Sequence, residues 1–207
     1  MTPLKVAVVG ASGAVGRLVV EELVQRGHSV TGLSTHPDRI PSAPSVTAVE
    51  ADANDSATLP TLLAGHDVVV TSIQYAKTDH ASLIRSVRES GVPRYVVVGG
   101  SGTLLVPGTT TRIMDTPQFP QSYRPPAEAA AHFFDLLQVQ DDLDWTILCP
   151  PPAFFEGGRT GRFRLGEDEL LSDEDGKAAI SYEDYAIALT DEIEQARHSR
   201  RRFTLAY

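Results

Sequence analysis

The chain has 207 residues, a formal net charge of −9 and a single cysteine, Cys149. Hydrophobic residues make up 42% and charged residues 22%, a composition typical of a globular protein with a sizeable core. The negative charge, without a basic patch interleaved with aromatic residues, argues against a nucleic-acid partner. One cysteine excludes an internal disulfide, and six histidines without ligand spacing predict no metal site.

Strand-like and helix-like segments alternate along most of the chain. Strands are predicted at Lys5–Val9, Ser29–Ser34, Val46–Glu50, Val68–Ser72, Tyr95–Val98 and Trp145–Leu148, and helices at Ala14–Gln25, Ala57–Leu63, Ala81–Glu89 and Ala127–Val139. Several strands, such as DVVV before Thr71, are apolar on both faces, which is typical of a parallel sheet with helices on each side. Right-handed crossovers then favour an α/β, doubly wound, Rossmann-like sheet formed by one domain over residues 1–207.

Beyond residue 150 the alternation changes. Residues 151–180 are predicted to form a substrate-side segment within the same domain, with a short strand and an exposed acidic hairpin at Glu167–Asp175. A helix is predicted from Tyr182 to Ala196, and the final RRFTLAY alternates like an added strand. No apolar run approaches the roughly 20 residues that cross a bilayer. We therefore expect a cytoplasmic protein without a membrane partner, either a monomer or a homodimer.

The segment VAVVGASGAVGRLVVEEL, from Val6 to Leu23, joins the first predicted strand to the first predicted helix. Gly10, Gly13 and Gly16 fall at intervals of three, GxxGxxG in place of the usual GxGxxG dinucleotide fingerprint. A helix that opens directly after a strand presents unpaired N–H groups and the positive end of its dipole, an arrangement that binds pyrophosphate. The same glycines also fit a tight turn without a ligand. Other segments of the chain therefore have to decide between a nucleotide-binding turn and a purely structural one.

Small and polar residues follow the carboxyl ends of five predicted strands, which is where a doubly wound sheet binds its ligand. Chance could place such residues at one strand end, but hardly at five, and nucleotide binding is therefore predicted. The expected nucleotide-binding residues are Gly10, Ala11, Ser12, Gly13, Ala14, Val15 and Gly16, then Ser34 and Thr35, Asp52 and Ala53, and Thr71, Ser72 and Ile73.

The position that discriminates between NAD and NADP carries no acid. NAD sites usually place a carboxylate about twenty residues beyond the glycines, where it binds the ribose hydroxyls. Ser34 and Thr35 occupy that position here, and the first carboxylate is Asp38. A 2′-phosphate would therefore not be repelled, and Arg17 and Arg39 could attract it, although each also fits an ordinary surface arginine. We predict NADP as the cofactor, with NADPH preferred over NADH.

The chain resembles the atypical short-chain dehydrogenases/reductases that are similar to biliverdin reductase B and to NAD(P)H–flavin reductases. VAVVGASGAVG, VEADAND, YVVVGGSGTLL, LDWTILCPPPAFFEGGRTGRFRL and ISYEDYAIALTDEIE carry the resemblance, which covers essentially the whole chain. It implies NAD(P)H over the glycine segment, the adenine edge near Asp52 and Ala53, and Ser101 near the nicotinamide. It also implies that Cys149, Pro150 and Pro151 flank the nicotinamide on its far side.

Two positions depart from this family pattern. Members that prefer NADPH often carry an arginine where Thr35 stands, so the cofactor preference stays open. The histidine that follows two prolines in the biliverdin and flavin reductases is Pro152 here. The substrate end of those reductases is therefore not reproduced.

The tyrosine–lysine pair of a typical short-chain dehydrogenase is absent. In that pair a lysine four residues after the tyrosine lowers its pKa, so that it can protonate a carbonyl oxygen. Tyr123 is followed at that distance by Ala127, and two intervening prolines predict that Tyr123 precedes the helix. Ser101 and Tyr123 are the candidate catalytic residues, although Tyr123 also fits a pocket-lining aromatic. His132 fits a structural residue better than a base.

These features predict an NAD(P)H-dependent oxidoreductase whose partner is a small-molecule substrate. A flavin-like or quinone-like ring can accept hydride and take its proton from water, so a flat conjugated acceptor suits the missing pair. Two alternatives stay open. One is a non-catalytic NAD(P)H-sensing regulatory protein, which the missing pair and the acidic hairpin would suit. The other is an NAD-dependent epimerase or isomerase that holds its cofactor tightly.

Overall fold

The computed structural model describes residues 2–207. Its main sheet contains eight strands, and all neighbours pair in parallel except β10 and β8, which are antiparallel. The order across the sheet is β3 (Val46–Glu50), β2 (Ser29–Ser34), β1 (Lys5–Val9), β4 (Val68–Thr71), β5 (Arg94–Val98), β6 (Trp145–Cys149), β10 (Arg201–Ala206) and β8 (Arg164–Gly166). The strand order reverses direction beside β1, which makes the β1–β4 boundary the topological switch point.

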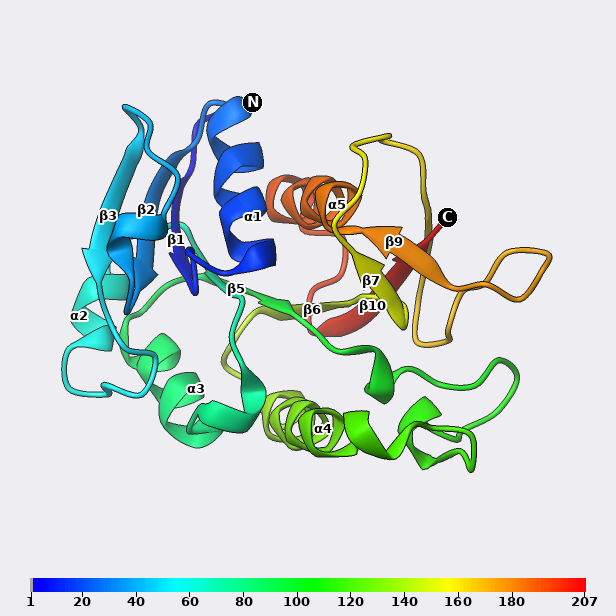
Figure 1. Cartoon of the computed structure of the whole chain (residues 1–207). Helices are drawn as coiled ribbons and strands as arrows, with labels where there is room; N and C mark the ends of the chain where they lie inside the picture. Colours follow the sequence, from blue (N-terminus) through cyan, green and yellow to red (C-terminus); the bar gives the residue numbers. More distant parts are fainter. Residues whose placement is uncertain (1) are drawn as a thin grey trace.

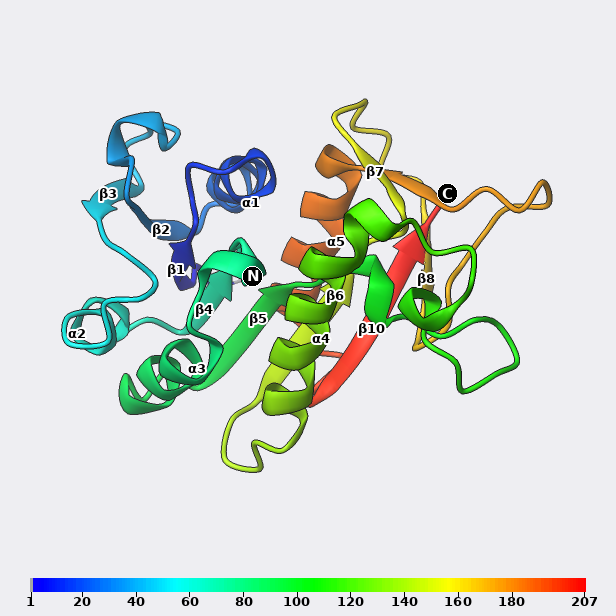
Figure 2. The ribbon, with the colours of Figure 1, turned by 60° about the horizontal axis from the view of Figure 1, so that its bottom comes forward.

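Helices cover both faces of this sheet, as Figure 1 shows. Helices α1 (Ala14–Gln25) and α5 (Tyr182–Gln195) pack together on one face. On the other face lie α2 (Leu59–Leu63), α3 (His80–Glu89) and α4 (Arg124–Gln138), which Figure 2 brings forward. The predicted doubly wound, Rossmann-like α/β fold is therefore confirmed.

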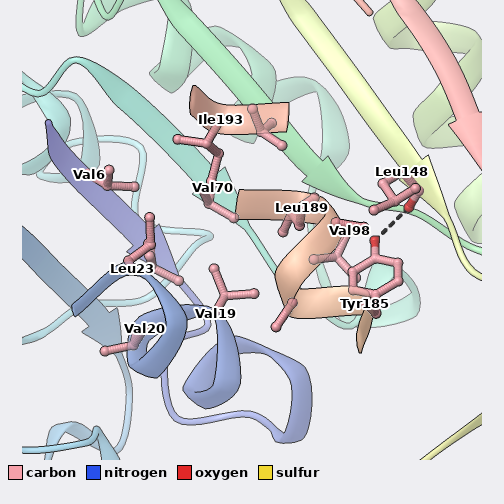
Figure 3. Close-up of a cluster of buried hydrophobic side chains, with 14 of the residues drawn as sticks. Val6, Val19, Val20, Leu23, Val70, Val98, Leu148, Tyr185, Leu189 and Ile193 are labelled. Carbon is pink, nitrogen blue, oxygen red and sulfur yellow. Dashed lines mark hydrogen bonds between the residues drawn. The ribbon is translucent and has the colours of Figure 1, made fainter. Parts of the chain in front are cut away.

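Two hydrophobic cores hold the layers together, one on each face. Every residue of β4 and β5 is buried, which explains why these strands are apolar on both sides. On the α1–α5 face, Val19 and Leu23 pack with Leu189 and Ile193 (Figure 3). The Tyr185 hydroxyl in this core donates to the Leu148 carbonyl over 2.6 Å, and burial raises the pKa of Tyr185 well above its ordinary value.

The predicted helices and strands recur with small shifts at their ends. Helix α4 begins at Arg124, three residues earlier than expected, and Tyr123 is its N-cap residue. The expectation that Tyr123 precedes the helix is confirmed. Prolines are tolerated in a first helical turn because its N–H groups have no intrahelical acceptor. Within residues 2–207, no helix has both the length and the apolar character needed to span a bilayer.

The segment after residue 150 contains a second sheet that the sequence patterns did not predict. β7 (Ala153–Phe155) pairs in parallel with β9 (Ala179–Ser181), and α5 follows β9 directly. Ser181 caps α5 by accepting from the backbone N–H of Asp184 over 3.1 Å. This packing joins the β6–β8 connection to α5.

Asp184 holds the loop between β7 and β8 from within α5. It accepts hydrogen bonds from the Thr160 hydroxyl at 2.5 Å, the Gly161 N–H at 2.8 Å and the Tyr207 hydroxyl at 2.9 Å. Burial acts to raise the pKa of Asp184, but these donors outweigh it and lower the pKa below its ordinary value. The loop is thereby fixed by an ionised carboxylate.

Candidate functional site

The turn between β1 and α1 requires two of its glycines for steric reasons. Gly10 has φ +85°, and a Cβ there would collide with the Ser72 carbonyl oxygen. A Cβ on Gly16 would collide with the Gly10 carbonyl oxygen. The turn is also anchored to the second strand, because the Gly10 N–H donates to the Leu33 carbonyl over 2.8 Å. These contacts hold the start of α1 close above the end of β1.

Gly13 has a different environment from the other two glycines. It is the N-cap of α1, has the ordinary extended φ of −74° and is exposed. A Cβ there would lie 3.3 Å from the Gly10 carbonyl oxygen, a tight contact that requires the turn to shift by a few tenths of an ångström, and the side chain would project over the helix terminus. The first-turn N–H groups of α1 have no intrahelical acceptor and remain available to an anion.

A cavity of about 690 Å³ lies above this turn, and we call it the glycine-turn cavity. It extends across the carboxyl ends of β1 to β4, where doubly wound sheets bind ligands. The residues of the predicted nucleotide site that line it are Gly10, Ser12, Gly13, Ala14, Val15, Ser34, Thr35, Asp52, Ala53, Ser72 and Ile73.

The end of the glycine-turn cavity beyond β2 is polar and carries positive charge. The Ser34 hydroxyl contacts the Ser12 hydroxyl at 2.6 Å and accepts from the His36 N–H at 3.0 Å, which fixes the chain after β2. Arg39 and Lys77 both line the cavity. Among the described residues that line it, Asp52 alone carries a carboxylate.

Asn54 ties two loops together at this end. Its side-chain amide donates to the Lys77 carbonyl over 3.1 Å, and its side-chain oxygen accepts from the Asp79 N–H over 2.8 Å. The loop after β3 and the loop after β4 are therefore joined where both of them line the cavity. This link fixes the backbone that carries Lys77.

A second cavity, of about 470 Å³, adjoins the first, and we call it the Ser101 cavity. Ile73 and Val98 line both cavities. Ser101 belongs to η3 (Ser101–Thr103), the short turn after β5, and Tyr123 lines the same cavity from η5 (Gln121–Tyr123) with 65% of its surface exposed. The structure therefore brings the two candidate catalytic residues to one cavity.

The Ser101 cavity has no charged side chain among the described residues that line it. Its walls are mainly apolar, with Ile113, Phe119 and Pro152 among them. Tyr75, from η2 (Tyr75–Lys77), also lines it, but its hydroxyl donates to the Val98 carbonyl over 2.6 Å. Burial raises the pKa of Tyr75 well above its ordinary value, so this phenol stays protonated at neutral pH.

Three residues predicted to bind the nucleotide do not line either cavity. Ala11 is fully buried, and Gly16 packs against the backbone of Gly10. Thr71 is also fully buried, and its hydroxyl lies 3.0 Å from the Tyr95 hydroxyl in the core. Side chains alternate between the two faces of a strand, and Thr71 therefore points into the core while the next residue lines the cavity. Ala11 and Gly16 therefore belong to the packing of the turn, and Thr71 to the core beside β5.

The Cys149–Pro151 segment is also buried and lines neither cavity. Cys149 lies 3.6 Å from the Thr103 hydroxyl, and burial raises the pKa of its thiol to about 11. Pro152, one residue beyond the segment, is exposed and lines the Ser101 cavity. That Cys149, Pro150 and Pro151 flank the nicotinamide stays a prediction, and Pro152 is the residue of this stretch that lines the Ser101 cavity.

Arg17 and His132, two further candidates from the sequence, line neither cavity. Arg17 pairs with Glu156 at 3.0 Å. His132 is exposed on α4 and contacts His80 at 3.1 Å between their Nδ1 atoms. Lys77, by contrast, lines the glycine-turn cavity without having been predicted, because nothing in its surrounding sequence marks it as a ligand contact.

The strand order, the glycine turn and the cavity at the switch point define a dinucleotide-binding α/β protein. The chain belongs to the NAD(P)H-binding family, whose model matches residues 10–196. The predicted resemblance is confirmed at this level.

One protein of similar sequence and two solved structures match this chain over nearly their whole length. The chain is 35% identical over 212 residues to the uncharacterized protein YwnB of Bacillus subtilis, covering 98% of each. It is 33% identical to a candidate epimerase from Bacteroides thetaiotaomicron, with a TM-score of 0.94 and coverage of 100% of this chain and 98% of that one. It is 34% identical to a candidate NADH-flavin reductase from Streptococcus pneumoniae, with a TM-score of 0.83 and coverage of 98% and 99%.

Proposed function

We propose that the protein is an NAD(P)H-dependent reductase that passes hydride to a flat, conjugated and uncharged acceptor in the Ser101 cavity. The proposal rests on one observation: Ile73 and Val98 line both the glycine-turn cavity and the Ser101 cavity. A dinucleotide whose pyrophosphate lies on the glycine turn would extend its nicotinamide toward these two residues. An acceptor in the neighbouring cavity would then meet the ring that supplies the hydride.

The residues of the glycine-turn cavity fit such a dinucleotide. The exposed Gly13 leaves space over the N–H groups of the first turn of α1, which would bind the pyrophosphate. Arg39 and Lys77 would attract a 2′-phosphate, and no carboxylate from the loop after β2 lines the cavity. We therefore propose NADPH over NADH, although the Streptococcus relative is described as a reductase that uses NADH.

The Ser101 cavity favours an acceptor that carries its own electron sink. Ala127 lines it at the position where a typical short-chain dehydrogenase has its lysine, so that position offers Tyr123 no cation. Ser101 would orient the acceptor or the nicotinamide by hydrogen bonding. Because the cavity supplies no cation to stabilise an alkoxide, a ring that delocalises the charge and takes its proton from water suits it better than a ketone.

A matched set of acceptors tests this proposal through the steady-state oxidation of NADPH. A naphthoquinone and the same ring with a sulfonate form the first pair, and riboflavin and FMN form the second. We expect turnover of the neutral members, and a KM at least tenfold higher for the sulfonated quinone because a charge inside the apolar cavity loses hydration. Ser101→Ala should lower kcat, whereas Ser56→Ala, an exposed serine outside both cavities, should not.

If the protein binds NADPH but oxidises it with none of these acceptors, the reductase proposal is wrong and a non-catalytic NAD(P)H-sensing protein is supported.

The high TM-score to the candidate epimerase favours one further activity. An epimerase would retain NAD on purification and equilibrate two hydroxyl epimers without net oxidation of the cofactor. Tyr75 is a poor base for that chemistry, because its proton is held by the Val98 carbonyl.

A further inference from the structure

The turn η3 connects the Ser101 cavity with the core on the α4 side of the sheet. Ser101, at its start, lines the cavity, and Thr103, at its end, is buried. The turn is short, with the Leu104 N–H donating to the Ser101 carbonyl over 3.1 Å and the Thr103 hydroxyl donating to the Gly100 carbonyl over 3.1 Å. A displacement of Thr103 would therefore move Ser101 as well.

A single guanidinium contacts this turn from a strand about one hundred residues away. Arg202, in β10, is buried, and its Nη1 donates to the Thr103 carbonyl. Its Nε lies 2.9 Å and its Nη2 lies 2.7 Å from the same oxygen of Asp168. The guanidinium carbon lies 4.8 Å from the centre of the Phe134 ring of α4. Four segments of the chain thus meet at one side chain.

The backbone beside Asp168 adds a second connection to the chain that follows η3. The Asp168 carbonyl accepts from the Leu105 N–H over 2.9 Å, and the Leu105 carbonyl accepts from the Leu170 N–H over 2.9 Å. The Asp168 side chain orients Arg202 toward Thr103, while its backbone holds Leu105. The start of the acidic segment after β8 is therefore attached to the turn that carries Ser101.

The structure assigns Arg202 the role of a positioning residue that fixes η3, and through η3 the hydroxyl of Ser101, with Asp168 as its counter-ion. Arginine suits this role because its planar guanidinium donates in several fixed directions, whereas a lysine ammonium offers only a compact point charge. The effect on turnover rests on the proposed function, since it requires Ser101 to act in the reaction. The effect of Arg202 on the position of η3 does not depend on the proposed function.

Arg202→Lys should lower kcat with a neutral quinone by roughly 10- to 100-fold, because small misplacements of a reacting group have effects of this size. The dissociation constant for NADPH should stay within about twofold, since neither Arg202 nor η3 lines the glycine-turn cavity. Arg201→Lys is the matched control. Arg201 neighbours Arg202 on β10, but its side chain is 66% exposed and lies 3.9 Å from Glu167. Asp168→Asn, a substitution at a half-exposed carboxylate, should give a smaller loss of the same kind if Arg202→Lys folds poorly.

Two measurements separate positioning from a general loss of structure. In a Ser101→Ala background, Arg202→Lys should have little further effect on kcat, because the hydroxyl that it positions is gone; independent, multiplicative losses would overturn the role. Hydrogen exchange of the Leu104 amide should be at least tenfold faster in Arg202→Lys than in Arg201→Lys. Equal exchange rates in the two variants would refute the role assigned to Arg202, whether or not the protein turns over any acceptor. A lack of turnover with every acceptor would refute only the proposed function.

Discussion

Gly13→Val separates the binding of the dinucleotide from the stability of the glycine turn. The substituted residue keeps an extended backbone, and its Cβ lies 3.3 Å from the Gly10 carbonyl oxygen, so we expect the turn to form with a shift of a few tenths of an ångström. Replacing an N-cap glycine by a residue without a capping oxygen costs about 1 kcal/mol. The two methyl groups, however, would cover the N–H groups that we expect to bind the pyrophosphate.

The size of the binding loss follows from those N–H groups. A hydrogen bond to a charged group contributes roughly 1.5–3 kcal/mol, so losing two of them removes about 3–6 kcal/mol. Since about 1.4 kcal/mol corresponds to a factor of ten, the dissociation constant for NADPH should rise at least a hundredfold. Fluorescence titration with NADPH measures this constant, and urea unfolding followed by circular dichroism measures the stability of the same variant.

Gly158→Val and Gly16→Ala are the controls for this experiment. Gly158 is exposed, does not line the glycine-turn cavity and has open space around its Cβ position, so both measurements should match the parent. Gly16→Ala instead forces a Cβ against the Gly10 carbonyl oxygen and should destabilise the fold by about 1–3 kcal/mol or more. If Gly13→Val binds NADPH within threefold of the parent, the turn has only a structural role and our reasoning about the pyrophosphate is wrong.

Three further predictions address other parts of the molecule. Thr35→Asp should weaken NADPH binding by charge repulsion and leave NADH binding equal or better. Thr35→Arg should strengthen NADPH binding by about 1–2 kcal/mol. Titration of each variant with both cofactors would show whether the adenosine ribose lies beside Thr35. Tyr123→Phe should keep turnover of a flavin or quinone within roughly tenfold, and a hundredfold loss in kcat would make Tyr123 a catalytic acid. Asp184→Asn should destabilise the protein by about 2 kcal/mol at pH 7, because four donors, the Thr160 N–H among them, lose a charged acceptor. The folded-state pKa of Asp184 is lowered, so the stabilisation is present above the unfolded pKa of about 3.9 and is lost as the pH falls through the folded pKa. Urea unfolding from pH 7 to pH 3 should therefore show the difference in unfolding free energy between parent and variant shrinking. A difference that stays constant would contradict an origin in the ionised carboxylate.

Local patterns predicted the main sheet and its helices because each element carries its own periodicity. β7 and β9 escaped prediction because each has three residues, and their pairing joins Ala153 to Ala179 across a long, irregular connection. Strand ends identified most of the glycine-turn cavity, since the carboxyl ends of parallel strands lie at one edge of the sheet. The sequence does not show that the Thr71 side chain is buried, because the last residues of a strand alternate between the core and the cavity.

The walls of the Ser101 cavity were the hardest part to predict. Phe119 and Gln118 lie in an irregular segment whose sequence has no periodicity, and their position depends on how that segment folds back over η3. Arg202 carries no motif either, and its contact with Thr103 depends on the pairing of β10 with β6. Such long-range contacts follow from the assembled fold and not from the residues around them.

The two cavities are encoded by largely successive stretches of the chain. The glycine-turn cavity is lined by residues from Val9 to Val98, and the Ser101 cavity by Ile73, Tyr75 and residues from Val98 to Pro152. Exchanging the stretch after β5 between relatives would replace most of the lining of the Ser101 cavity and leave the lining of the glycine-turn cavity in place. The boundary is the end of β5, where Val98 serves both. If the proposed function holds, divergence of acceptor choice within a lineage requires no change in the part of the gene that encodes the glycine turn.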